Sequence, residues 1–351
     1  MLDDESVVLG AAERILADLC DLQEMTRAGE GAWAARLWPA LEANGLTLAM
    51  SPEEAGGPGL DLVEAFALLR LAGRYAMPAP LAETMLARWA LAAAGLRAPD
   101  DGVLVPIAPF PDAAPRIDAQ GRVTGLARGV AFGRDAALFA VLCEGPDGLV
   151  LAAVEPSEAT VVEGRSLAFD PFDRVSFDAA RSRDSAPAGA AEALPCFAAA
   201  ARAELIAGAL ERLLEVTVRY AGERVAFERK IAKFQAVQHL LAQLGEEAAA
   251  AVAAAGSASE ALASGAQGLE RLLEVAAARI RCAEAAEKAT DIAHQVHGAI
   301  GFTAEHPLHR LTLRALAWRE DFGTETHWSV ALGQAVAARG ADGLWPLLAA
   351  R

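Results

Sequence analysis

Apolar residues recur at helical spacing through the first hundred residues of the chain. Trp33, Leu37 and Leu41 lie four residues apart, which places their side chains on one face of a helix. A dense run of glycine and proline at residues 51–60 interrupts this pattern and is typical of a turn. We therefore predict an N-terminal helical domain over residues 1–102.

The pattern changes to short apolar runs between turns over residues 103–188. The runs have the length of strands and lie at 103–107, 138–142, 149–154 and 174–177. The sequence 181–191 is rich in serine, alanine and proline, and we interpret it as the linker that leaves this domain. Residues 103–188 are therefore predicted to form a small β-domain.

Helical spacing returns over residues 189–351. Ile206, Leu210 and Leu213 begin an apolar stripe that is typical of a buried helix face. An alanine-rich stretch at 248–263 contains a glycine and two serines, and we predict a hairpin between two long helices there. The order of helices, strands and helices predicts a mainly α chain of three domains with a small β-domain in the middle.

Length and charge narrow the functional classes. The chain has 351 residues, which suits two or three packed units. Its net charge of −16 argues against a general nucleic-acid-binding role, because binding to phosphates needs clustered lysine and arginine. The densest cationic run lies at residues 219–233 and would suit the diphosphate of a coenzyme A.

The cysteines and the first residues favour a reduced cytoplasm as the compartment. Cys20, Cys143, Cys196 and Cys282 show neither a paired spacing nor the spacing of zinc ligands. Residues 1–5 are acidic and lack the basic start of a secretory signal. No strongly apolar run without charge approaches about eighteen residues, so no membrane span is expected.

The most distinctive motif lies where one long helix is predicted to end and another to begin. It has the form R-x2-F-x7-Q and consists of Arg224, Phe227 and Gln235. Because the first two lie three residues apart, we expect both on one helix face. Arginine offers a planar fork of donors to a diphosphate, and phenylalanine offers a flat surface to an aromatic ring. An isolated R-x2-F is more often an ordinary helix end with a phenylalanine in the core. Here Ile231 and Phe234 extend the motif to R-x2-F-x3-I-x2-F-Q, which is a rarer sequence.

A second motif spans residues 294–309. We expect a helix to end at Gly298, where the missing Cβ permits a positive φ, and the following N–H groups to approach an anion closely. An ordinary helix cap explains this glycine equally well. Histidines stand at 294, 297, 306 and 309, but no carboxylate or cysteine accompanies them in a ligand spacing, so no metal site is predicted.

The turn at 51–60 and the two motifs together resemble the acyl-CoA dehydrogenase family, and the resemblance covers nearly the whole chain. It implies an N-terminal helical domain, a middle β-barrel-like domain and a C-terminal four-helix bundle that assembles into dimers or tetramers. The implied activity is α,β-desaturation of an acyl-CoA. A glutamate removes the α-proton, the flavin of FAD takes the β-hydride, and the electrons leave to an electron-transferring flavoprotein.

The resemblance assigns cofactor contacts to five residues. Arg224, Phe227 and Gln235 match the helix pair that reaches the FAD of a neighbouring subunit. Gln295 and Gly298 stand where the family's Q-x2-G-G-x-G-F turn meets the FAD diphosphate.

The segments expected to hold the flavin ring depart from the family pattern. The family's T-E-P-x-A-G-S-D strand motif should fall near 105–113, where this chain has V-P-I-A-P-F-P-D-A and lacks the polar groups that hold the ring edge. The loop that usually carries lysine and tryptophan or phenylalanine beside the flavin reads G-L-A-R-G-V-A-F at 125–132. Glu228 replaces the family's glycine after Phe227.

The catalytic base of the family has no counterpart in the alignment. In one branch of the family it falls on Phe322, just before a Gly-Thr pair, and in another it falls on Ala198. The acidic residues near these positions in sequence are Glu204, Glu320, Asp321 and Glu325. The catalytic residue is therefore unassigned.

These features favour an acyl-CoA dehydrogenase-type flavoprotein that is one subunit of a hetero-oligomer and lacks its own base. Some bacterial members of the family pair a catalytic chain with a degenerate one, often for bulky substrates such as steroid side-chain CoA thioesters. Two alternatives stay open. One is a self-sufficient homo-oligomer with a displaced base, for which Glu320 or Asp321 is the candidate. The other is a non-enzymatic flavoprotein or binding subunit.

Overall fold

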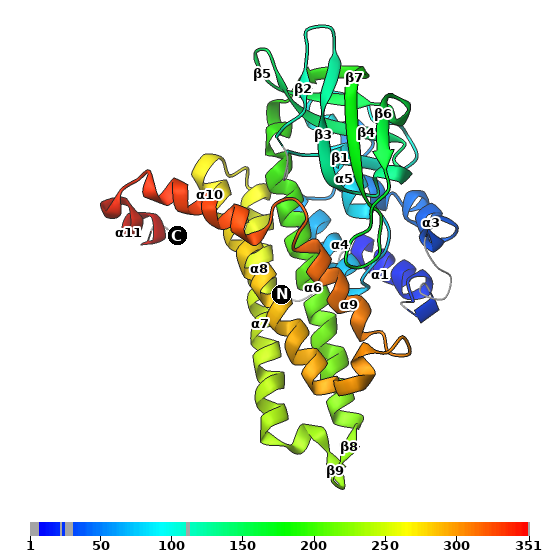
Figure 1. Ribbon diagram of the computed structural model, residues 1–351, viewed down its shortest axis with the longest axis vertical. Coiled ribbons are helices and arrows are strands. Elements are labelled where there is room, and N and C mark those ends of the chain that lie inside the picture. Colours follow the sequence, from blue (N-terminus) through cyan, green and yellow to red (C-terminus); the bar gives the residue numbers. More distant parts are fainter. Residues whose placement is uncertain (1–6, 22, 25–30, 110–112, 350–351) are drawn as a thin grey trace.

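The chain forms a long helical bundle with a β-domain at one end (Figure 1). The computed structural model describes residues 7–21, 23–24, 31–109 and 113–349. Residues 1–5, taken above as acidic and unlike a signal, and residues 110–112 of the flavin-strand segment lie outside the described part. The elements follow the predicted order of helices, strands and helices.

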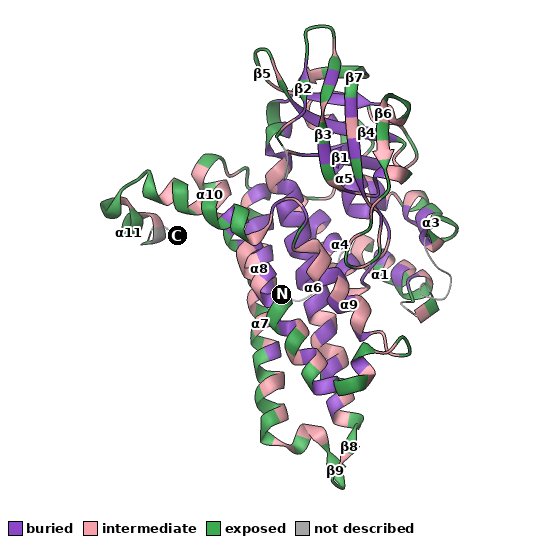
Figure 2. Ribbon diagram, in the orientation of Figure 1, coloured by how far each residue is buried: buried purple, intermediate pink, exposed green. Residues whose placement is uncertain are grey.

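The N-terminal helices pack beside the bundle and below the β-domain. They are α1 (Val7–Leu19), α3 (Leu37–Ala43), α4 (Leu62–Arg74) and α5 (Leu81–Ala93). Every residue of α5 from 81 to 91 is buried (Figure 2). Its Trp89 stacks on Phe197 of the bundle with ring centroids 3.8 Å apart, and its flank contacts the first strand of the β-domain. Helix α5 therefore joins the three parts of the chain.

The β-domain is a sheet closed into a small barrel. Its strands are β1 (Leu104–Ile107), β2 (Arg116–Ile117), β3 (Arg122–Ala131), β4 (Leu138–Gly145), β5 (Gly148–Val154), β6 (Ala159–Val162) and β7 (Phe172–Pro187). The sheet order is β1–β4–β2–β3–β7–β5, and β5 pairs again with β4, so the last five strands of this path form a ring. Closure removes strand edges that would otherwise be open to pairing. The barrel-like middle domain is thus confirmed.

The predicted linker at 181–191 is wrong over most of its length. Strand β7 continues to Pro187, and its residues 182–187 pair with β5. Pairing in the closed sheet outweighs a local composition that is typical of a loop. Pro187 stands at the end of the strand, where its missing N–H costs no ladder hydrogen bond.

Four helices make up the bundle: α6 (Leu194–Glu223), α7 (Gln235–Ala263), α8 (Gly268–His297) and α9 (Leu308–Trp318). Helices α10 (Glu325–Ala337) and α11 (Ala341–Ala349) follow and project from the side of the bundle (Figure 1). Helix α4 crosses α6 closely at two glycines. A Cβ on Gly208 would overlap the carbonyl oxygen of Arg70, and one on Gly73 would overlap that of Leu205.

The hairpin predicted at 248–263 is also wrong, because α7 runs without a break to Ala263 and the turn follows it. Alanine is the strongest helix former, and a single interior glycine costs only about 1 kcal/mol against it. The Ser259 hydroxyl contacts the Ala255 carbonyl one turn back, at 3.1 Å, so this serine does not interrupt the helix.

Helix α6 contains a long apolar stretch. Residues Gly189–Glu223 are long and apolar enough to span a membrane by length and composition, and 89% of the most apolar window is buried inside the protein. Its position at the centre of the bundle, packed against α4, α7, α8 and α9, accounts for this composition.

Candidate functional site

The R-x2-F-x7-Q motif forms an exposed hairpin at the far end of the bundle from the β-domain (Figure 1). Helix α6 ends at Glu223, and Arg224 has an extended backbone with φ −65° and ψ 124°. Strands β8 (Val225–Ala226) and β9 (Arg229–Lys230) then pair across a two-residue turn. The expectation that Arg224 and Phe227 share a helix face is therefore wrong.

The turn of this hairpin is made by two residues in the left-handed region. Phe227 has φ +51° and Glu228 has φ +65°, which is the backbone of the primed hairpin turns. Glycine adopts this region without a steric cost, and this explains why the family pattern has glycine at the second position. The turn also presents the Phe227 ring to solvent, since this residue is 89% exposed.

Aromatic and cationic side chains gather around the turn. The Phe227 and Phe234 rings meet edge to face with centroids 6.3 Å apart. The Arg229 guanidinium lies 3.9 Å from the centroid of the Phe234 ring. Gln235 begins α7 and is exposed, as Arg224 is. The hairpin thus offers donors and a flat apolar surface to a ligand that reaches it from outside the chain.

The second motif reaches the same end of the bundle. Helix α8 ends at His297, and Gly298 follows with φ +64°, as the sequence predicts. The Tyr220 hydroxyl of α6 donates a hydrogen bond of 3.2 Å to the His297 carbonyl, and the two rings stack with centroids 4.4 Å apart. These contacts tie the end of α8 to the last turn of α6. Gln295 and Gly298 are exposed there.

We call this region the end surface and define it by the five residues that the family resemblance assigns to FAD: Arg224, Phe227, Gln235, Gln295 and Gly298. All five are exposed, and Figure 2 shows the β8–β9 hairpin as exposed. The end surface carries the densest cationic run of a chain whose net charge is −16. An anion such as a diphosphate fits this combination of arginine, amide donors and a glycine turn.

Neutral histidines lie beneath the end surface. The Nδ1–H of His297 donates to the Ala293 carbonyl at 2.8 Å, so the unprotonated Nε2 points into a buried space without a hydrogen-bond partner. Nε2 of His294 contacts the Thr312 hydroxyl at 3.1 Å, and its Nδ1 is likewise buried and unpaired. Within the described residues, no group of three or more histidine, cysteine or acidic side chains is placed to hold a metal ion.

This arrangement predicts acid sensitivity. Burial, with smaller effects from His306 and His294, lowers the pKa of His297 to about 4, from an ordinary value of about 6.5. Below pH 6.5 the unfolded chain binds a proton at this histidine while the folded chain resists it. We therefore expect the free energy of unfolding to fall by about 2–3 kcal/mol between pH 6.5 and pH 4 through this group.

Urea denaturation of the wild type and the His297→Gln variant across this range checks the prediction. The variant should lose much of the pH dependence. His239→Gln, at an exposed histidine of α7, is the control and should keep it. An equal slope in all three proteins would contradict a role of the buried imidazole.

The segments expected around the flavin ring meet elsewhere, between the β-domain and α5. Residues 106–108 at the end of β1, residues 127–131 of β3 and the segment 321–322 surround a single small cavity together with Glu83 of α5. Its volume is about 20 Å³, which is room for about one water molecule. The fold therefore brings together the three segments that the family resemblance assigns to the reaction centre, and the cavity that all three line is this small one.

A buried ion cluster fills the space behind this cavity. Arg202 of α6 pairs through Nη2 with Glu83, and its Nε donates to Asp321 Oδ2 at 2.7 Å. We call these three residues the Glu83–Arg202–Asp321 triad. Their side chains are no more than 7% exposed. Burial raises the pKa of Glu83, whereas the two carboxylates more than offset burial and raise the pKa of Arg202.

A second buried arginine fixes the segment that carries Phe322. The Arg279 Nη2 group of α8 lies within 2.8–3.4 Å of four backbone carbonyls, those of Trp318, Arg319, Asp321 and Gly323. Phe322 has φ +51°, and the Arg202 guanidinium lies 5.0 Å from its ring centroid. The family resemblance aligns this phenylalanine with the catalytic glutamate of one branch of the family.

The acidic candidates for the catalytic base lie in different surroundings. Asp321 is held in the ion pair with Arg202. Glu320 is exposed and pairs with Arg319 at 3.4 Å. Glu204 lies buried between α6 and α7, where burial raises its pKa to about 7 and Ser259 donates a hydrogen bond to it, but it lines none of the described cavities. Ala198 is buried and has no acid–base group.

The flavin ring therefore does not fit the small cavity of this chain. An open depression of about 370 Å³ lies next to it and shares Arg128, Gly129, Asp321 and Phe322 with it. Phe322 and Arg128 stand at the junction of the two spaces. The residues of the end surface fit the diphosphate of FAD, but the closed cavity has no room for a tricyclic ring.

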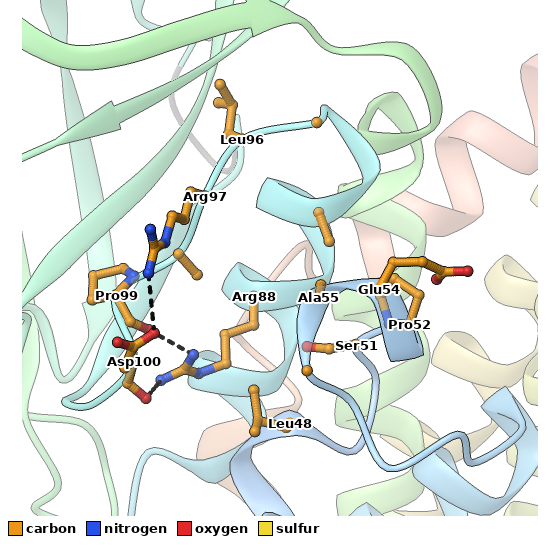
Figure 3. Close-up of a pocket in the computed structure, with 14 residues that line it drawn as sticks. Leu48, Ser51, Pro52, Glu54, Ala55, Arg88, Leu96, Arg97, Pro99 and Asp100 are labelled. Atoms are coloured by element: carbon orange, nitrogen blue, oxygen red, sulfur yellow. Dashed lines mark hydrogen bonds and ion pairs between the residues drawn. The ribbon is translucent and has the colours of Figure 1, made fainter.

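A larger cavity lies outside both regions. It measures about 620 Å³ and is bounded by the turn 51–56, by α5 and by residues 95–100. Figure 3 shows the Arg88 guanidinium directed at the residues of the last segment, where it donates to the Pro99 and Asp100 carbonyls at 2.8 and 2.9 Å. The remaining lining is mostly small and apolar, and none of it also lines the closed cavity. Arg88 thus acts as a brace for the connection from α5 to β1.

Comparison with known proteins identifies the family. The family description "Acyl-CoA dehydrogenase, C-terminal domain" matches residues 197–337. The acyl-CoA dehydrogenase IpdE2 of Mycobacterium tuberculosis is 31% identical to this chain over 289 residues, which are 80% of this chain and 80% of that protein. The chain belongs to the acyl-CoA dehydrogenase family of oxidoreductases.

Solved structures agree on the fold. The crystal structure of the ChsE4–ChsE5 complex from Mycobacterium tuberculosis matches with a TM-score of 0.86 and 24% identity, over 96% of this chain and 98% of that chain. A variant of the Tcur3481–Tcur3483 steroid ACAD matches with a TM-score of 0.85 and 25% identity, over 95% and 98%. The predicted acyl-CoA dehydrogenase-like fold is confirmed.

Proposed function

We propose that this chain is one subunit of an FAD-dependent acyl-CoA dehydrogenase, and that its end surface binds the diphosphate of an FAD whose ring is held by another chain. One observation carries the proposal. The five residues assigned to FAD are exposed at one end of the bundle, while the cavity shared by the three segments assigned to the reaction centre has a volume of only about 20 Å³.

Each part of the end surface has a role in this arrangement. Arg224 would pair with phosphate oxygens through its fork of donors. The Gly298 turn would let backbone N–H groups approach the same anion, and the Phe227 ring would cover an apolar part of the cofactor. When bound, FAD supplies the acceptor for the hydride from the substrate Cβ. The base that removes the α-proton would belong to the chain that holds the ring.

Two structural relatives favour a hetero-oligomer and a bulky substrate. The names ChsE4–ChsE5 and Tcur3481–Tcur3483 each denote two chains, and the second is described as a steroid ACAD. By analogy, we propose an acyl-CoA thioester with a bulky acyl group as the substrate. An electron-transferring flavoprotein would accept the electrons, and the cytoplasm would be the compartment.

The test is to purify the chain alone and after co-expression with an acyl-CoA dehydrogenase-like chain encoded beside it. We expect a colourless chain alone and a yellow, active complex whose flavin absorbance bleaches on addition of the acyl-CoA. A yellow homo-oligomer that bleaches without a partner would favour the self-sufficient enzyme. A complex that binds FAD but never bleaches would favour the non-enzymatic binding subunit.

The Glu228→Gly variant tests the hairpin itself. Glycine adopts the positive φ of this position without strain, and the change removes a carboxylate beside the proposed phosphate site. An exposed charge at contact distance changes the interaction by about 1 kcal/mol in water. We therefore expect FAD to bind severalfold more tightly to the complex, as measured by flavin fluorescence. Glu223→Gly, at an exposed position before the hairpin, is a control for general charge effects.

A further inference from the structure

We infer that the Glu83–Arg202–Asp321 triad is a plug that permanently occupies the acyl-binding chamber of this chain, so that the chain has no acyl-CoA site of its own. The inference rests on the proposed function in one respect, because it takes the junction of β1, β3 and segment 318–324 as the reaction centre of the family fold. It goes beyond that proposal by naming what closes the chamber and what the chamber can no longer bind.

The location of the triad carries the first step. Glu83 and Asp321 line the 20 Å³ cavity, together with Phe322 and residues of β1 and β3. Arg202 lies directly behind them and bridges both carboxylates. Ligand sites for apolar groups are large, mostly apolar and open to entry. Here the space between α5, β1 and β3 contains three charged side chains and one water-sized void, and the open depression beyond Phe322 does not extend into it.

The ion pairs of this region resist displacement by an apolar ligand. Glu83 and Asp321 are both paired with Arg202, and the buried Arg279 donates to the backbone carbonyl of Asp321. An acyl chain entering this space would have to separate the ion pairs. It would offer no hydrogen bonds to replace theirs. Separating a buried ion from its partner strongly destabilises the folded protein. We therefore do not expect an acyl chain to displace this cluster.

The backbone around Phe322 carries the third step. Arg279 holds four carbonyls of segment 318–323, so the segment cannot swing out without breaking these contacts. Arg202 in turn faces the Phe322 ring. The plug thus joins α5, α6 and the 318–324 segment, and Arg279 of α8 holds that segment in place.

The experiment counts ligands per chain in the purified oligomer. A non-oxidisable thioether analogue of an acyl-CoA, carrying a photoreactive group at the end of its acyl chain, is bound at saturation to this chain alone and to its complex with the partner. We expect no specific binding to this chain alone. In the complex we expect one analogue per partner chain, with no cross-link to α5 or to segment 318–324 of this chain.

A triple variant tests whether removing the triad opens the chamber to the analogue. The Glu83→Ala/Arg202→Ala/Asp321→Ala protein loses all three charges together, and we expect it to bind the analogue and to be cross-linked at segment 318–324. Arg122→Ala/Asp118→Ala, which removes an exposed ion pair of the β-domain, is the control and should bind none. A folded triple variant that binds no more analogue than the wild type would overturn the plug.

The wild-type measurement decides the question even if the triple variant does not fold. One analogue per copy of the wild-type chain, or a cross-link within its α5, would overturn the inference. The proposed function fails in a different way, through a complex that has no FAD and no activity. In that case the absence of the analogue from this chain would still support the plug.

Discussion

Replacing Arg202 by methionine is expected to lower the free energy of unfolding by about 3–5 kcal/mol, because the change leaves two buried carboxylates without a partner. Glu83 and Asp321 are nearly inaccessible to water, and the arginine is their shared counter-ion. Methionine has a similar length and leaves the packing close to the original. The loss should therefore arise from charge and not from a cavity.

Chemical denaturation of the purified oligomer at fixed protein concentration gives the value. The control is Arg122→Met, which breaks an exposed pair with Asp118 and should cost less than about 1 kcal/mol. The Glu83→Leu/Arg202→Met/Asp321→Leu variant should recover most of the lost stability, since an apolar cluster leaves no unpaired charge. If Arg202→Met were as mild as Arg122→Met, the triad could not be the plug described above.

Replacing Arg224 by alanine is expected to weaken FAD binding by the active complex by about ten- to a hundredfold. Hydrogen bonds to charged groups contribute about 1.5–3 kcal/mol, and each 1.4 kcal/mol is a tenfold change in affinity. Because the residue lies on the exposed end surface, the folding of the chain should be unaffected. Retention of FAD through gel filtration, followed by titration with free FAD, measures the effect.

Arg116→Ala is the matched control for this change. Arg116 lies in the β-domain with a side chain that is 82% exposed, and it forms a weak pair with Glu144 at 3.6 Å. We expect the control to bind FAD like the wild type. Added FAD at high concentration should restore the activity of the Arg224→Ala complex. Unchanged affinity in Arg224→Ala would remove the arginine from the proposed cofactor site and leave the triad unaffected.

The type and order of the elements could be predicted from the chain, because period and turn composition are local properties. The runs at 138–142 and 149–154 form β4 and β5, and the N-terminal stripe at 37–41 lies in α3. Local composition failed where tertiary contacts override it. Pairing with β5 extends β7 to Pro187, and alanine carries α7 through 248–263.

The sequence predicted one of the two motifs of the end surface better than the other. The helix end before Gly298 was found because a glycine after an apolar stripe is a strong local sign. The geometry of Arg224 and Phe227 was missed, since three-residue spacing suggests one helix face but the chain leaves the helix at Arg224. The family's glycine at the position after Phe227 could have indicated the turn, because glycine readily adopts a positive φ.

The triad could not have been found from spacing. Arg202 is separated by 119 residues from each of its partners, Glu83 and Asp321. The available sign was a charge within a strongly apolar stretch of helix, at Glu83 in α5 and at Arg202 in α6, since such charges are seldom fully buried without a partner. That sign indicates a buried ion but not which residue neutralises it.

The sequence by itself determined the order of helical and strand regions, the family and the two motifs of the end surface, because each of these depends on residues close together in the chain. Tertiary structure alone decided that the barrel closes, that the two motifs meet at one end of the bundle, and that a charged cluster lies buried beside the small cavity. These features depend on contacts between residues far apart in the sequence, and only the packing of α5, α6, α8 and the β-domain brings those residues together.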